Sequence, residues 1–426
     1  MLKKTIKFLK QKYIVITQSI AFFPVLISLI FFILAIISIN VENTEFINSI
    51  KEKVPYLFIK DYETARAILS TIIGGILSLT VFSFSMVMVV LNQASSSFSP
   101  RLLPSLVSNV RHQIILGFYI GTLLFCIISF TALGAYGVDA DSLGLSTMLA
   151  AIASLICIGL FVYFINSISV AIQIHNIIDK IYDGTKCFLD AELKKQKENK
   201  IVTNTQNSED WTTIKIDRTG YYRSFDVSLL TKSIREKGNH IIILPYVNQH
   251  IWKGMPVLKV KNFIDEDELE NLLFCFDISP DRHAGENNET GLIKLMEVAV
   301  KAMSPGINDP GTAINAINKI GQLLNLYLEF PESNSRYVIN DKITITDFKI
   351  TAKEMMRMII QPIRLYAKHD NSVMYVLIKS LQFICENPNI SELNKSTIKK
   401  ELDAIKEDID KNVENSYDKQ ALIDVL

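Results

Sequence analysis

The sequence predicts an α-helical multi-pass membrane region with four transmembrane helices, followed by a cytoplasmic α+β domain with a small β-barrel-like part and a helical part. Two observations lead to this fold class. The first 175 residues contain four uncharged runs, each longer than the roughly 20 apolar residues that a helix needs to cross a bilayer. The remaining residues read as an ordinary polar globular chain, so the overall hydrophobic content of 49% averages two unlike halves.

The four uncharged runs place the transmembrane helices at about 14–39, 67–91, 113–138 and 142–174. The first run is too long for the apolar core of a secretory signal, and no cleavage site follows it, so we expect it to be retained. The second and third runs form an antiparallel hairpin, because the loop between them is too short to be a domain. The fourth run would be roughly 50 Å long as a helix, and we expect it to project into a helical stalk at 176–200.

Basic residues indicate the orientation of these helices. Cytoplasmic loops of membrane proteins carry an excess of Lys and Arg, and the connection at 139–141 carries only acidic charges. The bases lie before the first helix and between the second and third, at Lys3, Lys4, Lys7, Lys10, Lys12, Arg101 and Arg111. This pattern predicts that the N-terminus, the hairpin loop and the C-terminus are all cytoplasmic.

Composition excludes several classes of function. A formal net charge of +0 provides no basic field for nucleic acid. The five cysteines show no metal-ligand or disulfide spacing, and scattered free thiols fit a reducing cytoplasm. The absence of ionisable residues from the four runs disfavours a proton pump or a voltage sensor. We therefore expect no cofactor and no metal.

Small residues recur at four-residue spacing within the predicted helices, and such rows let helix backbones approach closely. The simpler interpretation is packing within one chain. The alternative is that one polar helix face lines a narrow passage between several subunits, which requires a homo-oligomer. That candidate face consists of Ser70, Gly74, Ser78 and Ser85. The other rows are Thr71 with Gly75, Gly117 with Gly121, and Ser146 with Ala150 and Ser154.

The loop that joins the second and third runs combines hydroxyl and amide side chains with a proline and a base. The side chains of interest are Gln93, Ser96, Ser99 and Arg101. The simpler interpretation is that the serines cap or end helices through bonds to the backbone. The alternative is a polar mouth segment in which Arg101 attracts an anion or a lipid phosphate.

After a polar linker, the period changes from helical to strand-like, which predicts a small β domain at 211–262. A mainly helical domain is expected at 263–426, with helices at about 265–276, 292–302, 310–328, 346–366, 372–386 and 391–414. The segment SPGINDP precedes the third of these helices. Gly306 is expected to allow a tight turn, and Asp309 with Pro310 reads as an N-cap followed by the first helical residue.

A candidate site would form if polar residues before and within SPGINDP converged. These residues are Arg282, Glu286, Ser304, Asn308 and Asp309. His283 in the same polar loop is most simply a solvated side chain. The chain contains no metalloprotease, phosphate-loop or nucleophile-elbow motif, so we expect no enzyme.

Two long motifs resemble a bacterial family of predicted membrane proteins, domain of unknown function 2254. They are QASSSFSPRLL between two membrane helices and KLMEVAVKAMSPGINDPGTAINAI further along, with GYYRSFD and KGMPVLKV between them. The resemblance covers essentially the whole chain. It implies a multi-pass region in the bacterial inner (plasma) membrane and a cytoplasmic domain, and it brings no established activity. Where the family tends to read Arg-x-x-x-Gln-Asp and then Phe-Gly, this chain has Arg282, Glu286, Asn287, Thr290 and Gly291.

Three functions are compatible with these features. The preferred one is an oligomeric channel or permeation protein with a cytoplasmic gate or vestibule. The second is a membrane-tethered cytoplasmic module that binds a ligand or a partner. The third is a membrane enzyme that acts on lipid.

Overall fold

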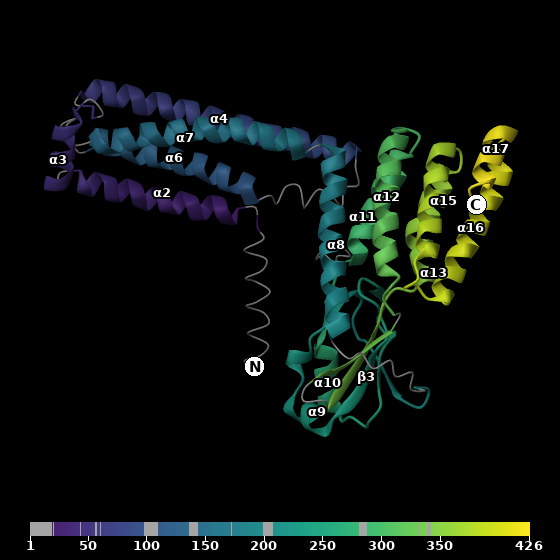
Figure 1. Ribbon diagram of the computed structural model, residues 1–426. Helices are drawn as coiled ribbons and strands as arrows, with labels where there is room; N and C mark the ends of the chain where they lie inside the picture. The colour runs from purple at the N-terminus through teal and green to yellow at the C-terminus, as the bar shows by residue number, and fades with distance from the viewer. Residues whose placement is uncertain are drawn as a thin grey trace. The chain divides into compact units, whose positions relative to one another are not determined.

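The computed structural model describes residues 19, 21–42, 44–55, 58–59, 61–97, 110–135, 144–171, 173–198, 208–280, 288–331, 333–338 and 342–426. Two compact units make up the chain, Met1–Asn176 and Ile177–Leu426. We call them the membrane unit and the C-terminal unit (Figure 1).

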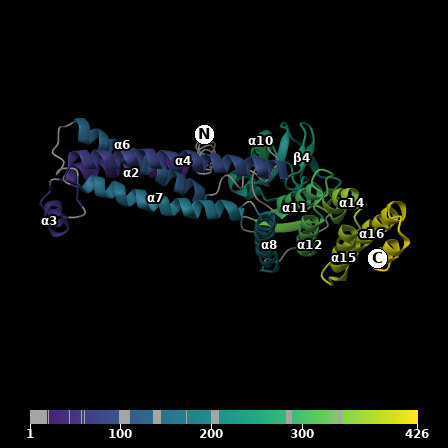
Figure 2. The same cartoon turned by 90° about the horizontal axis from the view of Figure 1, so that it is seen from above.

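Four long apolar helices lie side by side in the membrane unit (Figures 1 and 2). They are α2 (Phe22–Val41), α4 (Tyr62–Ser97), α6 (Val110–Ala135) and α7 (Gly144–Ala171). All four are long and apolar enough to span a bilayer, which confirms the expected four apolar helices. A short helix, α3 (Glu45–Lys53), lies between α2 and α4 in the sequence.

Helix α4 is longer at both ends than the run at 67–91 that predicted it. It has 36 residues, which make about 54 Å of helix. At its start, Asp61 Oδ2 accepts a hydrogen bond of 2.7 Å from the backbone N–H of Thr64, a polar cap that hydropathy does not detect. At its end, residues 92–97 continue the helix because they contain neither Gly nor Pro.

The other predicted ends also differ from the structure. The run at 142–174 is interrupted, because α7 ends at Ala171 and a separate helix, α8 (Ile174–Glu198), begins three residues later. Residues 14–18 of the first predicted helix and residues 136–143 around the third connection lie outside the described residues.

Two of the small-residue rows pack inside the membrane unit. A Cβ atom added to Gly117 would lie 2.9 Å from the Cα of Pro24, and one added to Gly121 would lie 2.8 Å from the ring of Phe31. Both glycines therefore let α6 approach α2 more closely than an alanine would allow. On α7, Ser146 and Ala150 are fully buried.

The C-terminal unit contains two open sheets rather than the expected small β-barrel. The five-stranded sheet has the order β1-β5-β3-β8-β7, and the three-stranded sheet has the order β4-β2-β6. Strand β8 pairs parallel with β3, whereas the other pairs are antiparallel. The strands are β1 (Thr212–Lys215), β2 (Gly220–Phe225), β3 (Asn239–Ile243), β4 (His250–Ile251), β5 (Pro256–Val260), β6 (Phe276–Ser279), β7 (Ser333–Val338) and β8 (Ile343–Phe348).

Strands β6, β7 and β8 lie in the part expected to be mainly helical. Residues 346–348, predicted as the start of a helix, belong to β8 instead, since they complete the ladder beside β3 and β7. The core of both sheets is aliphatic and aromatic, with Ile241, Leu258 and Ile345 fully buried.

Helices form the rest of the C-terminal unit, and most fall where the apolar periodicity predicts them. They are the short turn η4 (Val227–Leu229), α9 (Lys232–Lys237), α10 (Glu266–Phe274), α11 (Asn288–Ala302), α12 (Pro310–Tyr327), α13 (Ala352–Met355), the π-helical turn η5 (Met356–Ile360), α14 (Gln361–Ala367), α15 (Asn371–Glu386), α16 (Glu392–Asn412) and α17 (Ser416–Ile423).

Helix α8, expected as a stalk, packs against α11 and α12 of the C-terminal unit (Figure 1). Tyr182 Oη donates a hydrogen bond of 2.7 Å to Gln322 Oε1, and Lys319 Nζ forms an ion pair of 2.8 Å with Asp179. A Cβ atom at Gly291 would lie 2.9 Å from the Cβ of Thr185. Gly291 therefore permits a close crossing of α8 and α11.

Candidate functional site

The candidate polar face of α4 lies on the outside of the membrane unit. Ser70, Gly74, Ser78 and Ser85 are all exposed. A Cβ atom added at Gly74, or at the neighbouring Gly75, would meet no atom within 4 Å. Unlike the glycines on α6, Gly74 and Gly75 make no close approach to another helix among the described residues.

Two hydroxyl groups on or beside this face, those of Ser78 and Thr71, bond to their own helix. Thr71 Oγ1 donates to the carbonyl of Ala67 at 2.8 Å, and Ser78 Oγ donates to the carbonyl of Gly74 at 2.9 Å. Because these two donors are satisfied, Thr71 and Ser78 can lie against an apolar neighbour without a large desolvation cost. The face carries only Gly and Ser at its four positions, so its side chains are small.

A hollow of about 620 Å³ lies beside the first turns of α4. Its lining includes Thr64, Ala67 and Thr71, so it adjoins the exposed face at Thr71. The hollow is open to its surroundings and its lining is largely apolar.

The candidate hairpin loop is only partly described. Gln93 is exposed on the last turns of α4, and Ser96 is also helical. Ser99 and Arg101 lie outside the described residues. The proposed role of Arg101 as an anion-attracting side chain therefore stays a prediction.

In the second motif, Gly306 lies in the expected turn, but the positive φ of the motif belongs to Asn308. Asn308 has a positive φ of 48°, a conformation that Asn adopts more readily than most residues, whereas Gly306 has no positive φ. Asp309 Oδ1 accepts a hydrogen bond of 3.1 Å from the N–H of Thr312 and caps α12, and Ser304 Oγ donates to the carbonyl of Lys301 at 2.6 Å. The motif is thus a turn that joins α11 to α12. Arg282 and Glu286 lie outside the described residues.

Sequence reasoning missed Glu42, which is fully buried at one end of the membrane unit. Its carboxylate accepts hydrogen bonds from Leu145 N at 2.7 Å and from Ser146 N at 3.2 Å. Lys51 of α3 forms an ion pair of 3.0 Å with it. Glu42 therefore caps the first turn of α7, where the helix dipole favours an anion, and ties α2, α3 and α7 together. Because Glu42 follows the apolar run, a search within the runs could not find it.

A second cluster that the sequence did not reveal surrounds Glu289 in α11. Tyr327 Oη lies 3.4 Å from Glu289 Oε1 and accepts a hydrogen bond of 3.1 Å from Ile350 N. Lys349 Nζ lies 3.4 Å from the centre of the Phe330 ring and pairs with Glu192 of α8 at 2.8 Å. Burial raises the pKa of the Glu289 carboxyl and of the Tyr327 hydroxyl. Glu289 thus joins α11 to the end of α12 through the Tyr327 hydroxyl.

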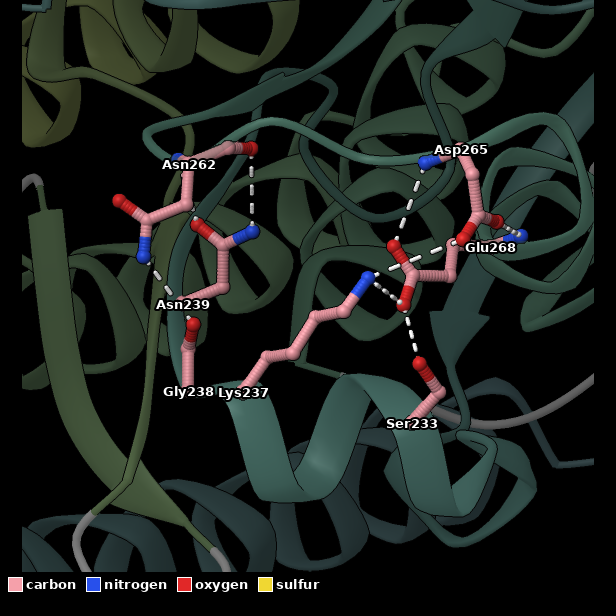
Figure 3. Close-up of polar contacts among 7 residues, drawn as sticks. All are labelled: Ser233, Lys237, Gly238, Asn239, Asn262, Asp265 and Glu268. Carbon is pink, nitrogen blue, oxygen red and sulfur yellow. Dashed lines mark hydrogen bonds and ion pairs between the residues drawn. The ribbon is translucent and has the colours of Figure 1, made fainter.

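The polar cluster in Figure 3 connects α9 with α10. The buried carboxylate of Glu268 accepts a hydrogen bond from Ser233 Oγ and forms an ion pair of 2.7 Å with Lys237 Nζ. It also forms a capping box with Asp265, whose Oδ1 accepts from Glu268 N at 2.8 Å. The hydrogen bonds from Lys237 and Ser233 lower the pKa of Glu268. Since these groups satisfy one another, the cluster is a structural clamp.

Beside the clamp, Asn239 at the start of β3 contacts Asn262, which follows β5 (Figure 3). Asn262 N donates to Asn239 Oδ1 at 3.0 Å, and Asn262 Nδ2 donates to the carbonyl of Gly238 at 3.1 Å. Within the described part of the chain, no group of three or more His, Cys, Asp or Glu side chains is placed to hold a metal ion.

Comparison with known proteins agrees with this architecture. Residues 17–382 match the family described as "Predicted membrane protein (DUF2254)". The chain belongs to this family. The resemblance seen in the two long sequence motifs is thereby confirmed, and the DUF2254 assignment covers both the membrane unit and most of the C-terminal unit.

Relatives of this DUF2254 chain include uncharacterized proteins from mycobacteria. Mb1321c of Mycobacterium bovis and Rv1290c of Mycobacterium tuberculosis are each 24% identical to it over 274 residues, which is 60% of this chain and 49% of theirs. The chain thus spans about half the length of these curated relatives. No solved structure matches it.

Proposed function

We propose that this chain is an oligomeric permeation protein whose copies meet along the outer face of α4. The proposal rests on a difference in burial between the small-residue rows. The rows on α6 and α7 pack against other helices of the same chain. The row on α4 is exposed at all four of its positions, Ser70, Gly74, Ser78 and Ser85.

Helices in a membrane associate mainly through close van der Waals packing, since lipid offers no hydrophobic driving force. A face of Gly and Ser allows two backbones to approach, and its exposed position leaves room for a helix of another copy. Four helices rarely enclose a passage alone, so a passage lined by this face requires several copies.

In this proposal the C-terminal unit acts as a gate or vestibule in the cytoplasm. Helix α8 follows α7 directly in the sequence and is held to the C-terminal unit by Asp179–Lys319 and Glu192–Lys349. A movement of that unit would therefore pull on the end of α7. The cytoplasmic location rests on the Lys and Arg pattern of the N-terminus and the hairpin loop.

Gly74→Leu tests the proposal with the full chain reconstituted in lipid. A Cβ atom at position 74 meets no atom of the same copy within 4 Å and Gly74 is exposed, so the fold should persist while the contact between copies is lost. We expect a smaller particle mass and abolished ion flux. Gly159→Leu is the matched control, because Gly159 on α7 is also an exposed helix glycine with open space around it.

Ser78→Leu adds bulk to the same face one helical turn from Gly74, and we expect it to lower the ion flux as well. Thr131→Leu is its control, because Thr131 on α6 is exposed and donates to its own helix at Ile127 in the same way as Ser78. A wild-type protein that is monomeric in lipid, or an assembly without flux, would contradict the proposal.

A further inference from the structure

A strip of three aromatic rings in the C-terminal unit ends in an exposed tryptophan. Trp252 exposes 62% of its surface and directly precedes the turn between β4 and β5. Its ring packs edge-on against His250, with 4.6 Å between ring centres, and His250 packs in the same way against Tyr221 of β2 at 4.9 Å. The strip therefore connects the three-stranded sheet to a large apolar side chain at the surface.

Hydrogen bonds fix the turn that presents Trp252. Gly254 has a positive φ of 88°, a conformation that glycine adopts readily. Gly254 N donates to the carbonyl of Ile216 at 2.7 Å, and Lys253 N donates to Thr219 Oγ1 at 3.1 Å. Because the turn is held against the loop after β1, Trp252 has little backbone freedom to lose on binding.

The two segments joined by these bonds, 215–219 and 250–256, carry an excess of positive charge. Their bases are Lys215, Arg218 and Lys253, and their acid is Asp217. Both lysines are exposed. The arginine side chain exposes 46% of its surface and lies 3.5 Å from the aspartate. The exposed indole is thus accompanied by basic side chains that reach the solvent.

This combination fits the surface of an anionic bilayer. Tryptophan is enriched where a membrane meets water, because its ring is largely apolar and its N–H is polar. Lysine and arginine near such a surface are attracted by anionic headgroups. Small-molecule sites are usually concave, whereas Trp252 stands at a turn and can enter a soft interface.

The membrane helices of the same chain keep a bilayer within reach. The C-terminal unit begins at Ile177, six residues after α7 ends at Ala171. A single weak membrane signal does not hold a free protein on a bilayer. A tethered unit needs only a weak contact, since the tether raises the effective concentration of the surface.

We propose that Trp252, together with Lys253 and Arg218, docks the C-terminal unit on the surface of an anionic bilayer. Through this contact, the position of the unit would respond to the anionic lipid content and to the salt concentration. The contact belongs to one copy of the chain and does not depend on the proposed assembly, so Gly74→Leu should leave it intact.

Fluorescence of the full chain in vesicles tests the docking directly, because its two Trp residues are Trp211 and Trp252. Trp211→Phe leaves Trp252 as the reporter. Trp252→Phe leaves Trp211, a matched control that is only partly exposed and packs against His240. In vesicles of phosphatidylglycerol and phosphatidylcholine with brominated chains, we expect the emission of Trp252 to be quenched and that of Trp211 to be unchanged. The quenching should weaken in pure phosphatidylcholine and at high salt, which screens the attraction.

Lys253→Glu tests the contribution of charge, since it reverses an exposed side chain beside Trp252. We expect less quenching of Trp252 in the anionic vesicles. Lys353→Glu makes the same change at an exposed position of α13 and should leave the quenching as it is. A Trp252 that is open to the water-soluble quencher acrylamide and is not quenched by brominated lipid would overturn the proposal. A Trp252 shielded from both quenchers would also overturn it, because protein would then cover the ring.

Discussion

Glu42→Ala should destabilise the membrane unit strongly, although Glu42 lies in no predicted transmembrane run. The side chain of Glu42 has 0% of its surface exposed, and that of its partner Lys51 has 17%. Removing the carboxylate takes this partner from the largely buried Lys51. It also leaves Leu145 N and Ser146 N without this acceptor at the first turn of α7.

The expected magnitude follows from this geometry. Breaking a buried ion pair by removing one partner costs about 3–5 kcal/mol, and we expect Glu42→Ala to fall in that range. Glu42→Gln keeps one acceptor oxygen for the α7 cap and should cost about 1–3 kcal/mol. Glu52→Gln on α3 is the control, because Glu52 is exposed and surface charges contribute little.

Thiol protection provides the assay. Cys126 and Cys157 are fully buried in the membrane unit, so their modification by a thiol reagent during heating or denaturation measures its unfolding. Both Trp residues, Trp211 and Trp252, lie in the C-terminal unit, and their fluorescence should be unchanged. The reasoning is refuted if Glu42→Ala exposes Cys126 and Cys157 no earlier than Glu52→Gln does.

Three further predictions concern the C-terminal unit, and Trp fluorescence of the full chain checks each. Gly291→Ala should cost about 1–3 kcal/mol because its Cβ atom overlaps Thr185, and adding Thr185→Gly should restore most of that loss; no rescue would mean that the two helices do not cross there. The pKa of Glu268 is lowered in the folded protein. The stabilisation by its carboxylate is therefore present above its usual pKa of 4.5 and is lost as the pH falls through the folded-state pKa. Glu268→Gln should be less stable than wild type at pH 7 and as stable as wild type in acid. The pKa of Glu289 is raised, so its effect on stability changes with pH in the opposite direction. Any stabilisation by Glu289 is present below pH 4.5 and is lost as the pH rises through its folded-state pKa. Glu289→Gln should therefore be more stable than wild type above that pH, and a less stable variant there would contradict the burial argument.

The membrane helices were predictable because twenty or more consecutive apolar residues have few alternatives to a spanning helix. Their ends were not, since α4 is extended by a cap at Asp61 and by polar helical residues at 92–97. The N-cap of Asp309 was predictable because capping is local. The role of Asn308 was not, because a positive φ depends on the path of the chain.

Long-range pairing limited the prediction for the sheets and for the buried polar groups. Strand β8 follows β3 by about a hundred residues in the sequence and still pairs with it. The local periodicity of the sequence could not reveal this pairing, so the predicted β domain ended before β8 and was expected to be a small barrel. The contact of Glu42 with α7 likewise joins residues that are more than a hundred positions apart. The small-residue rows look alike in the sequence. The structure distinguishes them, because Gly117 lies against α2 whereas Gly74 has no close neighbour among the described residues.

The most direct test of the central proposal is the particle mass of the full chain in lipid, measured together with ion flux for Gly74→Leu and Gly159→Leu. We predict that the wild type and Gly159→Leu form the same oligomer and conduct, while Gly74→Leu is smaller and silent. Equal mass and equal flux in both variants would show that the outer face of α4 neither joins the copies nor lines a passage.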